Sequence, residues 1–144
     1  MRNHKIEDNF QVMRWLQNYF HRQNLGIKIM APAEEMEDLN IIRDLHRQLK
    51  TAHFGIAEVS NNNLNVLYEA GLLHGMTKPL ILLQRSDAKE KVPFDIFSDY
   101  RIIYEVSRRG GDIQFVWLEE EMTKAMNAVK KMIPQLDQVP KWQE

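Results

Sequence analysis

Two spacings of apolar residues alternate along this chain, and they predict alternating helices and strands. Apolar residues three and four positions apart indicate amphipathic helices, whereas short unbroken apolar runs indicate strands that are covered on both faces. The helical spacing predicts a first helix over about 10–20, capped by Asp8 or Asn9. It predicts three more helices, over about 39–49 behind an acidic first turn (34–38), over about 63–76, and over about 115–133.

Four short apolar segments between these helices predict strands. They cover residues 27–32, 54–60, 80–84 and 101–106. We interpret the charged segment 85–92 as a surface loop, 93–97 as a helical turn begun by proline, and 107–112 as a turn-rich connection. Strands that alternate with helices favour parallel pairing through right-handed crossovers. The predicted fold class is therefore α/β, an open parallel sheet of the flavodoxin-like or Rossmann-like three-layer type.

The predicted domain organisation is simple. Residues 1–134 are expected to form a single domain and residues 135–144 a loosely held tail, since 144 residues suit one domain of ordinary size. An open sheet of this type normally begins with a strand, yet only a few residues precede the first predicted helix. Either the chain is a fragment or domain of a larger protein, which is the interpretation we favour, or the sheet lacks its first strand and that central position is filled otherwise.

Composition excludes several classes of function. A net charge of −1 lacks the positive footprint of a nucleic-acid-binding surface. The chain has no cysteine, so it has no disulfide and no thiolate metal site, and a cytoplasmic location is the default expectation. No apolar run approaches the roughly 20 residues that cross a bilayer, so no membrane partner is expected. The histidines are not spaced as metal ligands and no phosphate-binding glycine loop occurs, so neither a metal nor another cofactor is expected.

Polar residues follow the predicted strands, at the edge of a parallel sheet where ligands bind. After the strand over 54–60 come Ser60, Asn61 and Asn63; Arg85 follows the next strand, and Arg108 and Arg109 follow the last. We expect these side chains to share one crevice and to contact a ligand, with the arginines suited to phosphate. Asparagine is also a common helix cap, and paired arginines in a glycine-rich turn are commonly solvated, so both structural explanations stay open.

One carboxylate borders the expected crevice. Asn65 and Glu69 are four residues apart and share one face of the predicted helix, next to an apolar face formed by Val66, Ala70 and Leu73. Glu69 is therefore expected at the rim of the crevice rather than deep in the core. The alternative is an ordinary solvated helix carboxylate, which is where most glutamates are found.

The segment over residues 53–106 resembles the nucleoside 2-deoxyribosyltransferase-like superfamily, and most closely its TIR-like nucleotide-binding branch. Members of that branch often carry a strand ending in Asp, then N-P-N-V-x-Y-E-L-G, then G-K-P and an apolar strand. The residues in register are Asn63, Asn65, Val66, Tyr68, Glu69, Gly71, Lys78 and Pro79, followed later by Pro93, Phe94, Asp95, Tyr100 and Arg101. This chain departs from the pattern at Leu64, where proline is usual, and at Glu58, which replaces the strand-end aspartate. Asn63 also replaces an acid of the deoxyribosyltransferases proper, which counts against true base exchange.

The resemblance implies a role for Glu69 as the nucleophile, or as the group that stabilises a positively charged sugar, in cleavage of an N-glycosidic bond. It also implies that Tyr68 packs and that Gly71 permits a close approach of the helix to the sheet. The corresponding enzyme would be a nucleosidase, an NAD glycohydrolase or a deoxyribosyltransferase-like protein that acts on a nucleoside, a nucleotide or an NAD-like dinucleotide.

Three functions remain open from the sequence. The first is this N-glycoside hydrolase or transferase. The second is a non-catalytic module that senses a nucleotide and signals to an attached domain, and the third is a protein-interaction scaffold. The methionine-rich last helix is suited to core packing or to a homo-oligomer interface.

Overall fold

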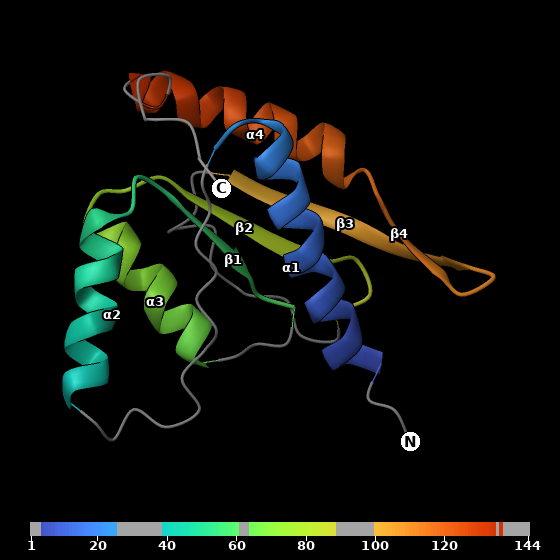
Figure 1. The fold of residues 1–144 in the computed structure, drawn as a ribbon, viewed down its shortest axis with the longest axis horizontal. Coiled ribbons are helices and arrows are strands. Elements are labelled where there is room, and N and C mark those ends of the chain that lie inside the picture. Colours follow the sequence, from blue (N-terminus) through green and yellow to red (C-terminus); the bar gives the residue numbers. More distant parts are fainter. Residues whose placement is uncertain (1–3, 26–38, 61–63, 89–99, 135, 137–144) are drawn as a thin grey trace.

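The computed structural model describes residues 4–25, 39–60, 64–88, 100–134 and 136, and these residues form an α/β fold (Figure 1). The elements are α1 (His4–Arg22), α2 (Leu39–Thr51), β1 (Gly55–Glu58), α3 (Leu64–Gly75), β2 (Leu80–Arg85), β3 (Tyr100–Arg109), β4 (Asp112–Val116) and α4 (Leu118–Met132). The predicted strand over 27–32 and the predicted helical turn over 93–97 lie outside the described residues, as do Asn61 and Asn63.

The sheet is mixed. Its four described strands are ordered β1-β2-β3-β4, and β1, β2 and β3 pair in parallel. The fourth strand pairs antiparallel with β3 through a tight hairpin. The predicted parallel sheet is therefore confirmed for three strands. The turn predicted over 107–112 is confirmed only for Gly110 and Gly111, because residues 107–109 continue β3 and Asp112 begins β4.

The hairpin owes its shape to two glycines. Gly110 and Gly111 have φ angles of 59° and 94°, and positive φ at both central residues is characteristic of the type I′ turn of a two-residue hairpin. Trp117 also has a positive φ, 68°, and separates β4 from α4. The last helix consequently begins at Leu118. The apolar spacing had predicted a start at about Phe115.

Helices pack on both faces of the sheet. Side chains of α1 and α4 cluster with Ile81, Leu83, Ile102 and Tyr104, whereas α2 and α3 cover Leu80 and Leu82 on the opposite face. Alternate residues of β2 point to opposite faces, so an apolar run such as Leu80–Leu83 fills both cores. In Figure 1, α2 and α3 lie beside each other, apart from α1 and α4.

The first helix is longer than predicted. It begins at His4, so Asp8 and Asn9 lie within it and do not cap it. In the sequence, Ile6 extends the apolar spacing of Phe10 and Met13 by one turn. At the other end of the chain Leu136, placed by the sequence in the tail, is buried with 4% of its surface exposed.

One glycine, but not the expected one, permits close packing of helix against sheet. A Cβ atom at Gly71 would meet no atom of the described residues within 4 Å, so the role predicted for Gly71 was wrong. A Cβ atom at Gly55 in β1 would overlap with Cδ1 of Leu73 in α3. The close approach of α3 to the sheet therefore depends on Gly55.

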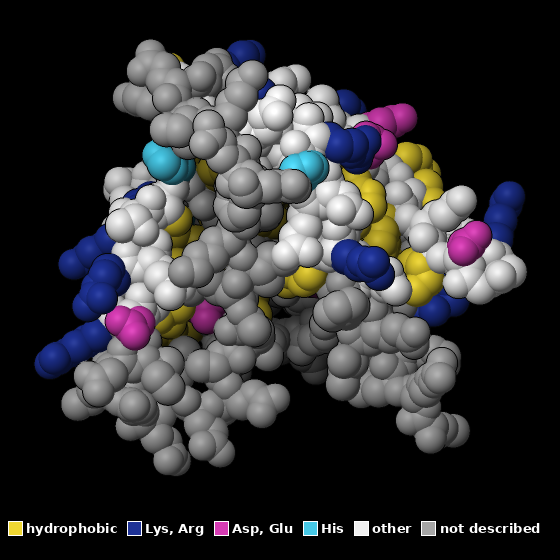
Figure 2. Space-filling view, in the orientation of Figure 1, with side chains coloured by type: hydrophobic (Ala, Val, Ile, Leu, Met, Phe, Trp, Pro, Cys, Tyr) yellow, Lys and Arg dark blue, Asp and Glu magenta, His cyan; other side chains and the backbone are white. Residues whose placement is uncertain are grey.

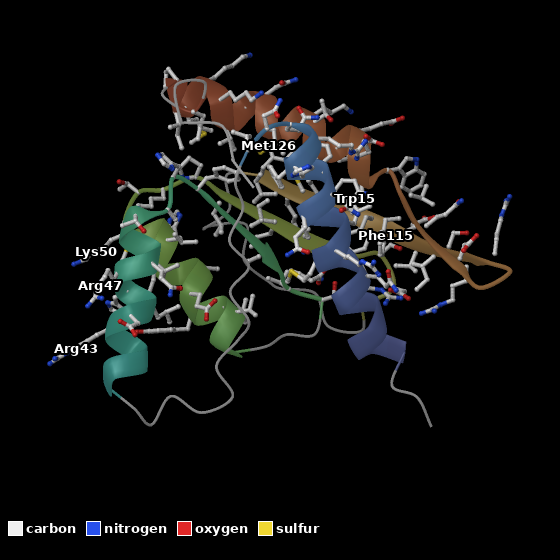
Figure 3. The ribbon with its side chains drawn as sticks, in the orientation of Figure 1. Trp15, Arg43, Arg47, Lys50, Phe115 and Met126 are labelled. Carbon is white, nitrogen blue, oxygen red and sulfur yellow. The ribbon has the colours of Figure 1, made fainter. Side chains whose placement is uncertain are left out.

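The outer face of α2 is basic. Arg43, Arg47 and Lys50 are exposed along it, at spacings of four and three residues that place them on one side of the helix. Figure 2 shows Lys and Arg side chains gathered along the edge of the molecule where α2 lies, and Figure 3 labels these three residues pointing outward.

Candidate functional site at the carboxyl ends of the parallel strands

Four polar or charged residues meet where β1 and β2 end, beside the middle of β3. Glu58 and Ser60 follow from β1, Arg85 ends β2, and Tyr104 lies on β3 directly opposite Arg85 in the pairing register. We call Glu58, Ser60, Arg85 and Tyr104 the strand-end cluster. The location agrees with the expected position of a ligand crevice in a parallel sheet.

Hydrogen bonds connect the members of the strand-end cluster. Oε1 of Glu58 accepts a hydrogen bond from the backbone N–H of Ser60 at 2.6 Å, and Oε2 accepts one from the hydroxyl of Tyr104. The hydroxyl oxygen of Ser60 accepts a hydrogen bond of 2.8 Å from the backbone N–H of Arg85. Side chains thus continue the connection between neighbouring strands just where the backbone ladder ends.

Burial changes the acidity of both titratable groups in the Glu58–Tyr104 pair. Desolvation raises the pKa of Glu58, although its hydrogen bonds to Ser60 and Tyr104 and the nearby charge of Arg85 oppose this effect. The pKa of Tyr104 is also raised, first by burial and then by the negative charge of Glu58. Tyr104 therefore keeps its proton and remains a hydrogen-bond donor to the carboxylate.

Arg85 is held by a neighbouring acid. Its Nε and Nη2 atoms each donate to one carboxylate oxygen of Asp87, both at 2.9 Å. The Arg85 side chain is mostly buried, with 15% of its surface exposed, whereas that of Asp87 is 66% exposed. This two-point contact fixes the plane of the guanidinium beside the strand-end cluster.

Glu69 lies in the second turn of α3 and is partly buried. Desolvation raises the pKa of its carboxyl, and no hydrogen bond or neighbouring charge contributes to that shift among the described residues. The surroundings of the Glu69 carboxyl differ from those of Glu58, whose two carboxylate oxygens each accept a hydrogen bond. The adjacent Tyr68 is 46% exposed, so the packing role implied for Tyr68 is at most partial.

The remaining predicted site residues are distributed differently from the expectation. Ser60 and Arg85 come together, and Asn65 belongs to the first turn of α3. Arg108 and Arg109 lie on the exposed end of the hairpin, four and five residues beyond Tyr104. At about 3.3 Å per residue, this places their backbones roughly 13–17 Å further along β3 than the strand-end cluster.

Tyr104 is the residue of the cluster that the sequence analysis did not single out. Its signal was a polar-tipped aromatic residue between two apolar residues, Ile102 and Val106, on the same face of β3. Glu58 was noticed only as a departure from a family pattern, although a carboxylate at the end of an apolar strand is itself a sign of a polar site.

Within the described residues, no group of three or more His, Asp or Glu side chains is arranged to hold a metal ion. None of the described helices combines the length and the apolar character needed to cross a membrane. The comparisons with known proteins found no matching family model, no matching curated protein and no matching solved structure.

Proposed function

We propose that this chain binds a nucleoside, a nucleotide or an NAD-like molecule at the carboxyl ends of β1 and β2. The observation that supports this proposal best is the strand-end cluster, in which Glu58, Ser60 and Tyr104 form a bonded polar network beside Arg85. Hydroxyl, carboxylate and guanidinium groups at such an edge suit the hydroxyls of a sugar and the oxygens of a phosphate. The motif residues around Glu69 support the same class of ligand.

We further propose that Glu69 acts on the N-glycosidic bond of the ligand. In this step a carboxylate oxygen of Glu69 attacks the anomeric carbon, the bond to the base breaks, and the base leaves with the bonding electrons and takes a proton from solvent. Water then hydrolyses the sugar–Glu69 ester. The nucleophile must be ionised, and burial raises its pKa above the ordinary value of 4.5, so base release should increase as pH rises through the raised value.

A second candidate is a sensing module that binds the same ligand without cleaving it. It is favoured by the closed bonding of the strand-end cluster, because both carboxylate oxygens of Glu58 already have partners. Groups bonded in this way suit rigid recognition better than proton transfer.

The test compares three proteins against a panel of nucleosides, nucleotides and NAD: the wild type, Glu69→Gln, and Glu120→Gln as a control on the exposed surface of α4. Released base is measured by chromatography and ligand binding by the shift in melting temperature. If the wild type and the control release base and Glu69→Gln does not, the hydrolase proposal is supported.

Binding without release by all three proteins would support the sensing module. If no member of the panel is cleaved or raises the melting temperature, the proposed ligand class is wrong. The control is needed because loss of any surface carboxylate changes the net charge by the same amount as Glu69→Gln.

A further inference from the structure

The outer edge of β4 is a free strand edge among the described strands. β4 is last in the sheet order, and among the described strands it pairs with β3 alone, from Asp112 with Arg109 to Val116 with Glu105. Such an edge presents unpaired backbone N–H and C=O groups, which natural proteins commonly protect with lysine, proline or a bulge. The segment Asp112–Val116 contains neither residue, and its register runs without a bulge.

A groove of about 710 Å³ runs between this strand and α1. One wall is a single stripe of α1, formed by Gln11, Arg14, Trp15 and Asn18, whose spacings of three and four residues place them on one side of the helix. The other wall is β4, from Ile113 to Val116. Figure 3 shows Trp15 on α1 and Phe115 on β4 close together in this view, and both line the groove.

The residues that line the groove indicate whether it follows the face or the edge of β4. A ligand lying on one face of a strand would meet alternate residues, because successive side chains point to opposite faces. Here four consecutive residues, Ile113–Val116, line the groove. The groove therefore follows the strand edge, where a second backbone would find the free hydrogen-bonding groups.

The described side chains of the groove combine one charge with two aromatic rings. Among the described residues that line it, Arg14 is the only charged one, and Arg14 is exposed. Trp15 and Phe115 are partly buried against the core, and Phe115 meets Tyr104 edge-to-face at 5.8 Å between ring centroids. A complementary ligand would bring a negative charge to Arg14 and an apolar group to the two rings.

We propose that this groove binds an extended peptide segment of a partner protein, which adds a strand to β4 and carries an acidic side chain to Arg14. Backbone hydrogen bonds to β4 provide binding that does not depend on sequence, and the side chains provide selectivity. Because side chains on one face of a strand are two residues apart, the segment should carry an acidic and an apolar residue at alternate positions. The five residues of β4 limit the paired length to about 17 Å.

In the experiment, phage that display random heptapeptides are selected for binding to the wild-type protein. Phage that also bind the variant Arg14→Glu are removed. The matched control is Arg43→Glu, which reverses an exposed charge on α2, outside the groove. Enriched peptides are synthesised with free and with N-methylated backbones, and their dissociation constants are measured by calorimetry.

We expect an enriched pattern of an acidic residue two positions from an apolar one, binding that is lost on N-methylation, and amide chemical shifts that move at Gln114 and Phe115. The dissociation constant should rise about fivefold to tenfold in Arg14→Glu, as reversal of one exposed ion pair allows, and stay unchanged in Arg43→Glu.

Three results would overturn the proposal. The first is the absence of any peptide retained by the wild type above the level retained by Arg14→Glu. The second is binding that N-methylation leaves intact, which would indicate a side-chain pocket without strand addition. The third is sedimentation of the protein as a dimer, together with amide exchange at Gln114 that slows as protein concentration rises. A second copy of the chain would then cover β4.

Discussion

At the scale of single residues, the Glu58–Tyr104 contact is the feature that most constrains the candidate site. The ring of Tyr104 is fully buried, and its hydroxyl reaches a carboxylate that also accepts a backbone N–H. A hydrogen bond to an ionised group is stronger than one between neutral groups, and its removal leaves the remaining buried partner incompletely satisfied.

Tyr104→Phe should therefore lower the free energy of unfolding by about 1–3 kcal/mol, the usual cost of leaving a buried polar group without its partner. Urea denaturation followed by circular dichroism measures this difference. Tyr68→Phe is the matched control, because that side chain is 46% exposed. Equal stability of the two variants would show that the Tyr104 hydroxyl contributes nothing to the fold.

The raised pKa of Glu58 predicts how stability depends on pH. Burial makes the folded state bind the Glu58 proton more tightly than the unfolded state does. This contribution is fully present below the unfolded value of about 4.5 and is lost as pH rises through the folded pKa. Glu58→Gln removes the titrating group, so its stability should decline less than that of the wild type across this interval.

The comparison uses urea midpoints of both proteins over the same pH series. The difference between the two curves isolates Glu58 from Glu69, whose pKa is also raised by burial. A constant difference at every pH would mean that the pKa of Glu58 is the same in the folded and unfolded states.

At the scale of elements, the unit β1-α3-β2 was predictable and the hairpin β3–β4 was not. Unbroken apolar runs and a clear helical spacing define the first unit, and the structure confirms it. The segment 107–112 is charged and contains two glycines, so it resembles a loop, although adjacent glycines between two strands are also a hairpin signal. The short strand Asp112–Val116 was not predicted, because Phe115 continues the apolar spacing of the helix that follows.

The packing of α3 on β1 gives a direct test at this scale. Gly55→Ala should lower the free energy of unfolding by about 1–3 kcal/mol, because the added methyl group would overlap with Cδ1 of Leu73 and force that buried side chain to shift. Gly75→Ala, at the end of α3, adds a methyl group that meets none of the described atoms within 4 Å, so it should leave stability unchanged or raise it by up to about 1 kcal/mol. Thermal or urea unfolding of both variants provides the comparison, and equal effects would contradict the packing described here.

At the scale of the whole molecule, the sequence predicted where a polar site lies better than it predicted which residues form it. Ser60 and Arg85 were expected at one edge because strand ends in a parallel sheet share that edge, and a hydrogen bond joins them. Arg108 and Arg109 were expected there too, but the length of β3 depends on pairing with β4, a long-range interaction that no local pattern reports. The contribution of Tyr104 likewise depends on a partner 46 residues away.

The most direct test of the proposed function is a map of backbone amide chemical shifts in the labelled protein as a nucleoside, a nucleotide or NAD is added. The proposal predicts shifts concentrated at Ser60, Arg85 and the first turns of α3, including Glu69, that saturate with ligand concentration. Shifts confined to the groove between α1 and β4, or no saturable shift with any of these ligands, would contradict it.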